Sequence, residues 1–301
     1  KRMFIEFQND VKVSDLQLAV QEGFENVEHA KRYTTLGMAT DQGKTSNING
    51  IHVLSQCLGK PVDKIGHTTF RPPYKPIPLG LIAGQYTKKL FMPVKKTPID
   101  EWNSTNNAIW EPVADWRRAY AYPKGNESLE DTLRREVLGV RKNVGLLDSS
   151  TLGKILVKGP DAGQFLDLIY TNMMSTLKAG KCRYGVMCNE AGFVFDDGVV
   201  ARLNEQSFLC HTTSGGADRV FAWLEEWLQT EWHQLKVFTV NLTEQYSQIT
   251  VAGPKARELL QAFKSINLSP QKLPFMQFIE TNIDDIWVRV YRISFSGELS
   301  Y

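Results

Sequence analysis

The sequence predicts an α+β protein, with antiparallel or mixed sheets and flanking helices. Strand-like and helix-like segments follow one another without the regular alternation that is typical of parallel α/β folds. Residues 181–189 and 192–203 have the composition of two strands joined by Glu190-Ala191, which indicates an antiparallel hairpin. The length of 301 residues allows more than one domain.

The overall composition limits the classes of partner. The chain is 42% hydrophobic and 23% charged, as in ordinary globular proteins, and its net charge of +2 gives no basic surface typical of nucleic-acid binding. No apolar run approaches the roughly 18 residues of a membrane span. The start, Lys1-Arg2-Met3-Phe4, lacks the apolar core of a signal peptide and suggests a fragment. We therefore expect a cytoplasmic protein without nucleic-acid or membrane partners.

Common chemical motifs are missing from the sequence. The four cysteines (Cys57, Cys182, Cys188 and Cys210) form no CxxC and have no partnering histidine pattern, so we expect reduced thiols and no metal site. The glycines form neither GxGxxG nor GxxxxGK[ST], and no GxSxG is present. A dinucleotide would therefore have to be bound by parts of the protein outside this sequence.

The first third of the sequence predicts helices followed by a connector. Residues 14–33 form one apolar stripe behind a capping box of Ser14 and Gln17, and residues 51–59 predict a second helix. Residues 68–84 contain four prolines, so this segment must be extended. A domain boundary is expected near residues 85–97.

The remaining sequence predicts strands and helices in irregular order. Residues 128–145 form a helix capped by Ser128 and Asp131, whose buried stripe comprises Leu129, Leu133, Val137, Val140 and Val144. A strand that ends at Gly159-Pro160 and an inward-facing helix follow, and then the hairpin described above. Further strands are expected at 207–213, 237–242 and 246–254, with a last strand and turn over residues 286–301. One helix is expected around Val220, Trp223, Leu224 and Trp227, and another over residues 254–263.

Two adjacent aspartates in the hairpin need an explanation. Asp196 and Asp197 lie in an apolar, β-prone run, where burying a charge is costly. Side chains alternate across a strand, so the two carboxylates should point to opposite faces. They mark a strand end or bulge, with Gly198 supplying the unusual backbone, or one of them serves as a base or acceptor beside a ligand amine. His211, on the next strand, is expected to be a satisfied core or edge histidine.

Several segments together resemble known families. LLDSSTLGKILVKGPDAGQFLDLIYTN, GKCRYGVMCNEAGFVFDDGVV, ITVAGPKA and RISFSGELSY resemble the folate-binding aminomethyltransferase fold of the glycine-cleavage T-protein. FIEFQNDV, RYTTLGMATDQGKTSN and TTFRPPY resemble the α subunit of heterotetrameric sarcosine oxidase, at the end of its nucleotide-binding region. The resemblance implies that residues 1–92 end an FAD/NAD-type oxidoreductase region, with the proline-rich connector. Residues 93–301 would form a folate-binding domain, truncated at its C-terminus.

The resemblance also implies an activity. In such a subunit sarcosine is oxidised to glycine at a flavin, hydrogen peroxide forms on a partner subunit, and the methylene group passes to tetrahydrofolate or leaves as formaldehyde. Tetrahydrofolate would bind in this domain, whereas FAD or FMN, NAD and the β, γ and δ subunits belong to the full complex. The alternatives are a dimethylglycine- or sarcosine-dehydrogenase-like protein, a stand-alone aminomethyltransferase, or a non-catalytic folate-binding or assembly module.

Candidate site residues follow from the matched motifs. The family's essential aspartate, the second of its pair, falls on Asp197, and its pterin-stacking tyrosine falls on Tyr184, which could otherwise be a cross-strand core residue. The other pocket positions fall on Leu152, Val199, Thr213 and Phe295, of which Leu152, Thr213 and Phe295 replace a family methionine, asparagine and tyrosine. A pterin-binding glutamate would lie four residues after Glu298, so we expect this chain alone to bind folate poorly.

Overall fold

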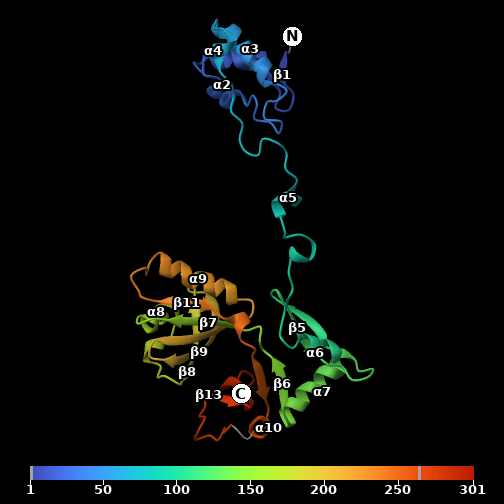
Figure 1. Ribbon diagram of the computed structural model, residues 1–301, viewed down its shortest axis with the longest axis vertical. Coiled ribbons are helices and arrows are strands. Elements are labelled where there is room, and N and C mark those ends of the chain that lie inside the picture. Colours follow the sequence, from blue (N-terminus) through green and yellow to red (C-terminus); the bar gives the residue numbers. More distant parts are fainter. Residues whose placement is uncertain (1–2, 264–265) are drawn as a thin grey trace. The chain divides into compact units, whose positions relative to one another are not determined.

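The structure, a computed structural model, describes residues 3–263 and 266–301 (Figure 1). The chain divides into two compact units, Lys1–Phe91 and Met92–Tyr301. The elements of the first unit are β1 (Phe4–Glu6), β2 (Val11–Lys12), α1 (Val13–Gln21), α2 (Val27–Thr34), α3 (Asn47–Leu58), α4 (Val62–Ile65), α5 (Leu79–Ala83) and the 3₁₀ helix η1 (Lys88–Leu90).

The N-terminal unit packs its first three helices around a small core. Leu16, Leu36 and Leu54 are fully buried there, and β1 pairs antiparallel with β2. The single helix predicted over residues 14–33 is wrong, because α1 ends at Gln21 and α2 begins at Val27. Gly23, with φ of 91°, turns the chain, and the Asn26 side chain accepts a hydrogen bond from Glu28 N (2.9 Å) to start α2.

The start of the proline-rich connector is fastened to this unit by a side-chain amide. Gln42 Nε2 donates to Arg71 O (2.8 Å), and Gln42 Oε1 accepts from Arg71 N (2.7 Å), as a neighbouring strand would. Lys44 Nζ donates to Tyr74 O (2.8 Å). Beyond Tyr74 the connector is irregular apart from the short helices α5 and η1, so the expectation of an extended segment holds only in part.

The C-terminal unit contains a five-stranded antiparallel sheet with strand order β11-β7-β10-β9-β8 (Figure 1). The predicted hairpin is confirmed as β8 and β9. The elements of this unit are β3 (Lys95–Lys96), α6 (Asp100–Thr105), β4 (Ile109–Val113), β5 (Trp116–Ala121), α7 (Leu129–Lys142), β6 (Gly145–Asp148), β7 (Gly153–Lys158), α8 (Ala162–Ile169), η2 (Met174–Thr176), β8 (Cys182–Cys188), β9 (Val194–Asn204), β10 (Ser207–Thr212), α9 (Ala217–Gln229), β11 (Phe238–Asn241), η3 (Thr243–Gln245), β12 (Ile249–Ala252), α10 (Ala256–Gln261), β13 (Gln277–Ile283) and β14 (Ile286–Arg292).

Both long helices that accompany the large sheet pack against the same face. Phe165 of α8 and Leu224 of α9 join Phe208 of β10 in one buried cluster. Burying large side chains of this kind stabilises the fold by about 1.5–3 kcal/mol each. The α+β prediction is confirmed by this antiparallel sheet and its helices, and the opposite face of the sheet is left free of α8 and α9.

Helix α7 begins as predicted but does not bury its apolar stripe. The Ser128 hydroxyl accepts a hydrogen bond from Asp131 N (3.2 Å) and caps the helix. The side chains of Leu129 and Val137 are nevertheless 45% and 57% exposed, so the predicted burial is wrong for them. The reason is that α7 packs beside β5 and β6, which belong to sheets of only three and two strands and offer little apolar surface.

The backbone of a neighbouring strand leaves no room for a side chain at Gly198 in the large sheet. A Cβ added to Gly198 would lie 1.9 Å from His211 O. We predict that Gly198→Ala lowers the free energy of unfolding by about 2 kcal/mol or more, because β9 and β10 must move apart. Urea unfolding followed by tryptophan fluorescence measures this, since all seven tryptophans lie in the C-terminal unit.

A glycine with open surroundings provides the control for this prediction. A Cβ on Gly139, within α7, meets no atom within 4 Å. Gly139→Ala should therefore raise stability by up to about 1 kcal/mol through helix propensity. Equal stability of the two variants would contradict the steric account.

Candidate functional site

The two adjacent aspartates of β9 have different surroundings. Asp196 is 4% exposed and points toward the turn that precedes α9. Its carboxylate accepts hydrogen bonds from Thr213 N (3.1 Å), from Thr213 Oγ1 (2.9 Å) and from Asp197 N (2.7 Å). A Cβ on Gly216 would lie 1.5 Å from Asp196 Oδ2, so glycine is needed there. Asp196 thus closes the β10–α9 turn.

Asp197 projects to the face that α8 and α9 leave free. Its Oδ2 accepts a hydrogen bond from the Tyr184 hydroxyl at 2.8 Å, which raises the pKa of Tyr184. Tyr184 lies directly across from Val199 in the β8–β9 pairing, and cross-strand partners share a face. The ring of Tyr184 is 51% exposed. Three of the predicted site residues are therefore neighbours on one accessible surface.

Within the described residues, the other three predicted residues form no hydrogen bond with this group. Thr213 uses both of its donors on Asp196, and its Oγ1 accepts from Gly216 N (3.1 Å). Phe295 is fully exposed after β14. Leu152 is half-buried in the turn before β7, where its carbonyl accepts a hydrogen bond from Lys154 Nζ (2.7 Å).

A half-buried histidine lies next to this group on the same face. His211 Nδ1 is 3.0 Å from Val199 O, and because a carbonyl oxygen only accepts, Nδ1 carries a proton and donates it. The ring of Tyr291 from β14 meets it edge-on, with centroids 5.5 Å apart. Burial lowers the pKa of His211 to about 4, so the ring stays neutral at pH 7.

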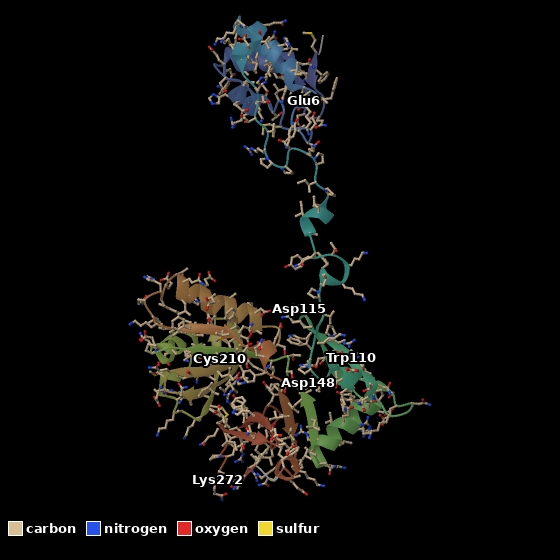
Figure 2. The ribbon with its side chains drawn as sticks, in the orientation of Figure 1. Glu6, Trp110, Asp115, Asp148, Cys210 and Lys272 are labelled. Atoms are coloured by element: carbon tan, nitrogen blue, oxygen red, sulfur yellow. The ribbon has the colours of Figure 1, made fainter. Side chains whose placement is uncertain are left out.

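A buried lysine, Lys154, lies beside His211 on the neighbouring strand β7. Lys154 pairs across from His211 and is 2% exposed, and its Nζ donates to Ser150 O (3.0 Å) as well as to Leu152 O. Burial lowers the pKa of Lys154 to about 8, and nearby Asp148, labelled in Figure 2, opposes this shift. The ammonium therefore fastens the turn that carries Leu152 to the sheet.

Sequence reasoning missed Lys154 and Tyr291 and treated His211 as a structural residue. A signal existed for Lys154, because a lysine within the apolar run GKILV falls on the same face as Leu156 and must be buried or paired. No sequence signal revealed that β14 covers His211, since β13 and β14 are separated from β10 by more than sixty residues.

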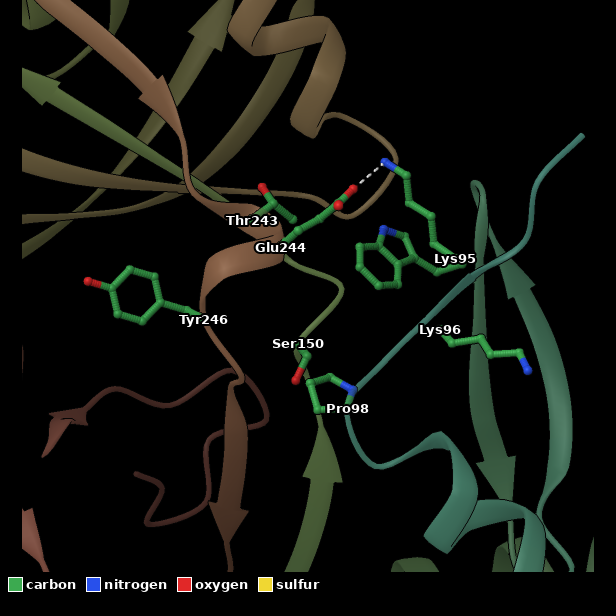
Figure 3. Close-up of a pocket in the computed structure, with 8 residues that line it drawn as sticks. Lys95, Lys96, Pro98, Ser150, Thr243, Glu244 and Tyr246 are labelled. Atoms are coloured by element: carbon green, nitrogen blue, oxygen red, sulfur yellow. Dashed lines mark ion pairs between the residues drawn. The ribbon is translucent and has the colours of Figure 1, made fainter. Parts of the chain in front are cut away.

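A cavity of ≈ 240 Å³ lies beside the turn that precedes β7 and contains Ser150 (Figure 3). Lys95 Nζ forms an ion pair with Glu244 Oε1 at 3.0 Å across it. Its lining residues are Lys95, Lys96, Pro98, Trp116, Ser150, Thr243, Glu244 and Tyr246. None of the predicted site residues lines this cavity. Ser150 lines it, and the Ser150 carbonyl accepts the hydrogen bond from Lys154, which links the cavity to Lys154 and His211.

In the described ranges, no group of three or more His, Cys, Asp or Glu side chains could hold a metal ion. All four cysteines are free. Among the same residues, no helix has both the length and the apolar character needed to cross a membrane.

Comparison with known proteins identifies the class. The family description "GCVT N-terminal domain" matches residues 99–301, and "Sarcosine oxidase A3 domain" matches residues 1–85. A crystal structure of the glycine cleavage system aminomethyltransferase T from Bartonella henselae superimposes with a TM-score of 0.59 and 27% identity. The alignment covers 69% of this chain and 52% of that one. The chain therefore belongs to the GCVT N-terminal domain family, and the T-protein-like fold is confirmed.

Relatives that match nearly the whole chain are alpha subunits of sarcosine oxidase. Over 99% of its length the chain is 45% identical to the sarcosine oxidase subunit alpha of Corynebacterium sp. (strain P-1), and over its full length it is 43% identical to that of Rhizobium meliloti (strain 1021). The resemblance seen in the sequence is thus confirmed. The chain spans about a third of these relatives, 31% of each. An aminomethyltransferase from Thermotoga maritima is 30% identical over 68% of this chain and 52% of its own.

The lowered pKa of His211 leads to a test by pH. His211 titrates near 6.5 when unfolded and near 4 when folded, so only the unfolded state gains a proton between these values. We predict that the free energy of unfolding falls by up to about 3 kcal/mol as the pH drops from 6.5 to 4. In His211→Gln this contribution should be missing.

Urea unfolding is measured at several pH values for the parent and the variants. The difference between them separates the contribution of His211 to the pH dependence from that of the carboxylates. Exposed His233 provides the control, and His233→Gln should keep the dependence of the parent. An unchanged slope in His211→Gln would show that His211 is not buried neutral.

Proposed function

We propose that the chain is the part of a sarcosine oxidase α subunit that presents tetrahydrofolate to the one-carbon unit released from sarcosine. The overall reaction is the oxidative demethylation of sarcosine to glycine, with hydrogen peroxide formed at a flavin on a partner subunit. The contact that supports the proposal most directly is the 2.8 Å hydrogen bond between Tyr184 and Asp197 on the helix-free face of the sheet.

The residues on this face fit a reduced pterin. A half-exposed aromatic ring at Tyr184 offers a stacking surface, and Asp197 offers a carboxylate that can accept a hydrogen bond from a ring nitrogen. Bound tetrahydrofolate would supply the nitrogens that accept the one-carbon unit. Asp197 would hold the proton that such a nitrogen loses and would stabilise positive charge that develops beside it.

The neighbours of Asp197 would keep this carboxylate in place. Tyr184 donates to one of its oxygens, and Asp196 accepts the Asp197 N–H, so side chain and backbone are both held. Val199 would form an apolar wall beside the ring, with Leu152 as a further wall. Thr213 would contribute by fixing Asp196, and Phe295 would add a ring where the family has tyrosine.

Partners and the remaining cofactors form part of the same proposal. The relatives are named as alpha subunits, which supports assembly with β, γ and δ subunits. FAD or FMN and NAD would bind in that assembly. The match of residues 1–85 to the sarcosine oxidase A3 domain favours this over a stand-alone aminomethyltransferase.

Replacing Asp197 tests the proposal. In the assembled complex, Asp197→Asn keeps the size of the side chain but removes its basicity. We predict a fall of roughly 100-fold or more in methylenetetrahydrofolate formation, with sarcosine oxidation intact and free formaldehyde released instead. Oxygen consumption and product analysis in the presence of tetrahydrofolate measure both steps.

A matched control comes from the same hairpin. Glu190→Gln removes a charge from the exposed turn between β8 and β9 and should leave both rates unchanged. If Asp197→Asn formed methylenetetrahydrofolate at the rate of the parent, Asp197 would not be the catalytic residue. No change in either rate would support the alternative of a non-catalytic folate-binding or assembly module.

A further inference from the structure

The turn that joins β6 to β7 is buried except at its last residue. From Asp148 to Thr151 its four polar residues are at most 8% exposed, whereas Leu152 is half-buried. Polar groups in such a place are costly to bury unless they are hydrogen-bonded. The turn must therefore be held by polar contacts, and the side chain that these contacts present is that of Leu152.

Hydrogen bonds hold this turn at both ends. At its beginning, Ser149 N donates to Gln248 O (2.9 Å), just before β12. At its end, Lys154 Nζ donates to Ser150 O (3.0 Å) and to Leu152 O (2.7 Å). A lysine has three N–H donors on one flexible stem, so a single side chain can bind two carbonyls of the same turn. The backbone of Leu152 is thus fixed by an ammonium that belongs to the large sheet.

The burial of this ammonium is not required by packing. Lys154 is 2% exposed, and burial lowers its pKa to about 8. An unbranched apolar side chain of the same length would fill the position without the cost of removing a charge from water. The charge is therefore explained by the turn that it binds.

The same lysine stands at one end of a row of side chains on the helix-free face. Lys154 pairs across from His211, His211 Nδ1 binds Val199 O, and Val199 pairs across from Tyr184. Cross-strand neighbours share a face, so these four side chains cross β7, β10, β9 and β8 in order over about 14 Å. A long ligand that stacks on Tyr184 and extends along this row meets the turn that carries Leu152.

We propose that Lys154 is a positioning residue for tetrahydrofolate: its buried ammonium fixes the turn of residues 148–152 and sets Leu152 against the bound molecule. This rests on the proposed function, because it requires folate on the helix-free face. Lys154 touches no reacting atom and acts through the turn. Its replacement should therefore change how tightly tetrahydrofolate binds, while the chemical step at Asp197 proceeds.

Replacing Lys154 in the assembled complex tests the proposal. Lys154→Met keeps the length of the side chain and removes its donors. We predict that the dissociation constant of tetrahydrofolate, measured by anaerobic calorimetric titration at pH 7, rises roughly tenfold, because two charge-assisted hydrogen bonds are lost. At saturating tetrahydrofolate, methylenetetrahydrofolate should form within about twofold of the parent rate, so the effect falls on KM rather than on kcat.

The pH dependence of binding is a readout that a purely structural lysine would not change. A neutral amine donates weaker hydrogen bonds than an ammonium, so loss of the proton loosens the turn. In the parent, the dissociation constant should rise about threefold between pH 7 and about pH 9.5, with a midpoint near 8. In Lys154→Met it should be the same at both pH values.

The charges around Lys154 determine how this midpoint can be moved. Asp148 of β6 opposes the lowering of the pKa of Lys154 by burial. His211 of β10 stays neutral in this range, Arg289 of β14 keeps its charge, and Glu244 of η3 pairs with another lysine. Asp148→Asn removes the opposing charge, so the midpoint should move to lower pH.

A lysine on the same strand provides the matched control. Lys158 is exposed at the end of β7, so Lys158→Met should leave both the dissociation constant and its pH dependence unchanged. If Lys154→Met bound tetrahydrofolate as tightly as the parent, this proposal would be overturned and the role of Asp197 would stand. Should Lys154→Met fail to assemble, an unmoved midpoint in Asp148→Asn would overturn it. A parent complex that binds no tetrahydrofolate would overturn both proposals.

Discussion

The alternation of side chains along β9 is the constraint on which the candidate site depends. Since α8 and α9 both pack on one face of the large sheet, adjacent residues of β9 cannot share an environment. Asp196 faces the turn before α9 and is held there by Thr213. This contact fixes the register, because a shift of one residue would bury Asp197 instead. The partly exposed position of Asp197 therefore follows from the burial of its neighbour.

The row of polar groups behind Asp197 explains how a carboxylate site can be rigid without many charges. His211 stays neutral and binds the backbone of Val199, and Lys154 binds the turn that carries Leu152. Both groups are satisfied by backbone carbonyls, and the Lys154 ammonium is the charge that this row buries. Because Tyr291 covers His211, this support also requires the hairpin of β13 and β14 to be in place.

Local signals determined how much of this could be predicted from sequence. The cap of α7 and the hairpin of β8 and β9 depend on neighbouring residues and were predicted correctly. The break between α1 and α2 was missed, because the apolar stripe continued through Gly23 and outweighed its turn signal. Contacts between distant strands, such as His211 with Tyr291, have no local pattern and could not be predicted. The family resemblance selected Asp197 and Tyr184, which the structure places in contact, but it did not foresee the role of Asp196 with Thr213.

The most direct measurement is an experimental structure of the assembled protein with bound tetrahydrofolate. The account predicts the pterin ring against Tyr184, with a ring nitrogen about 3 Å from a carboxylate oxygen of Asp197. A pterin bound elsewhere, for example in the cavity between Trp116 and Tyr246, with Asp197 free of ligand contacts, would contradict it.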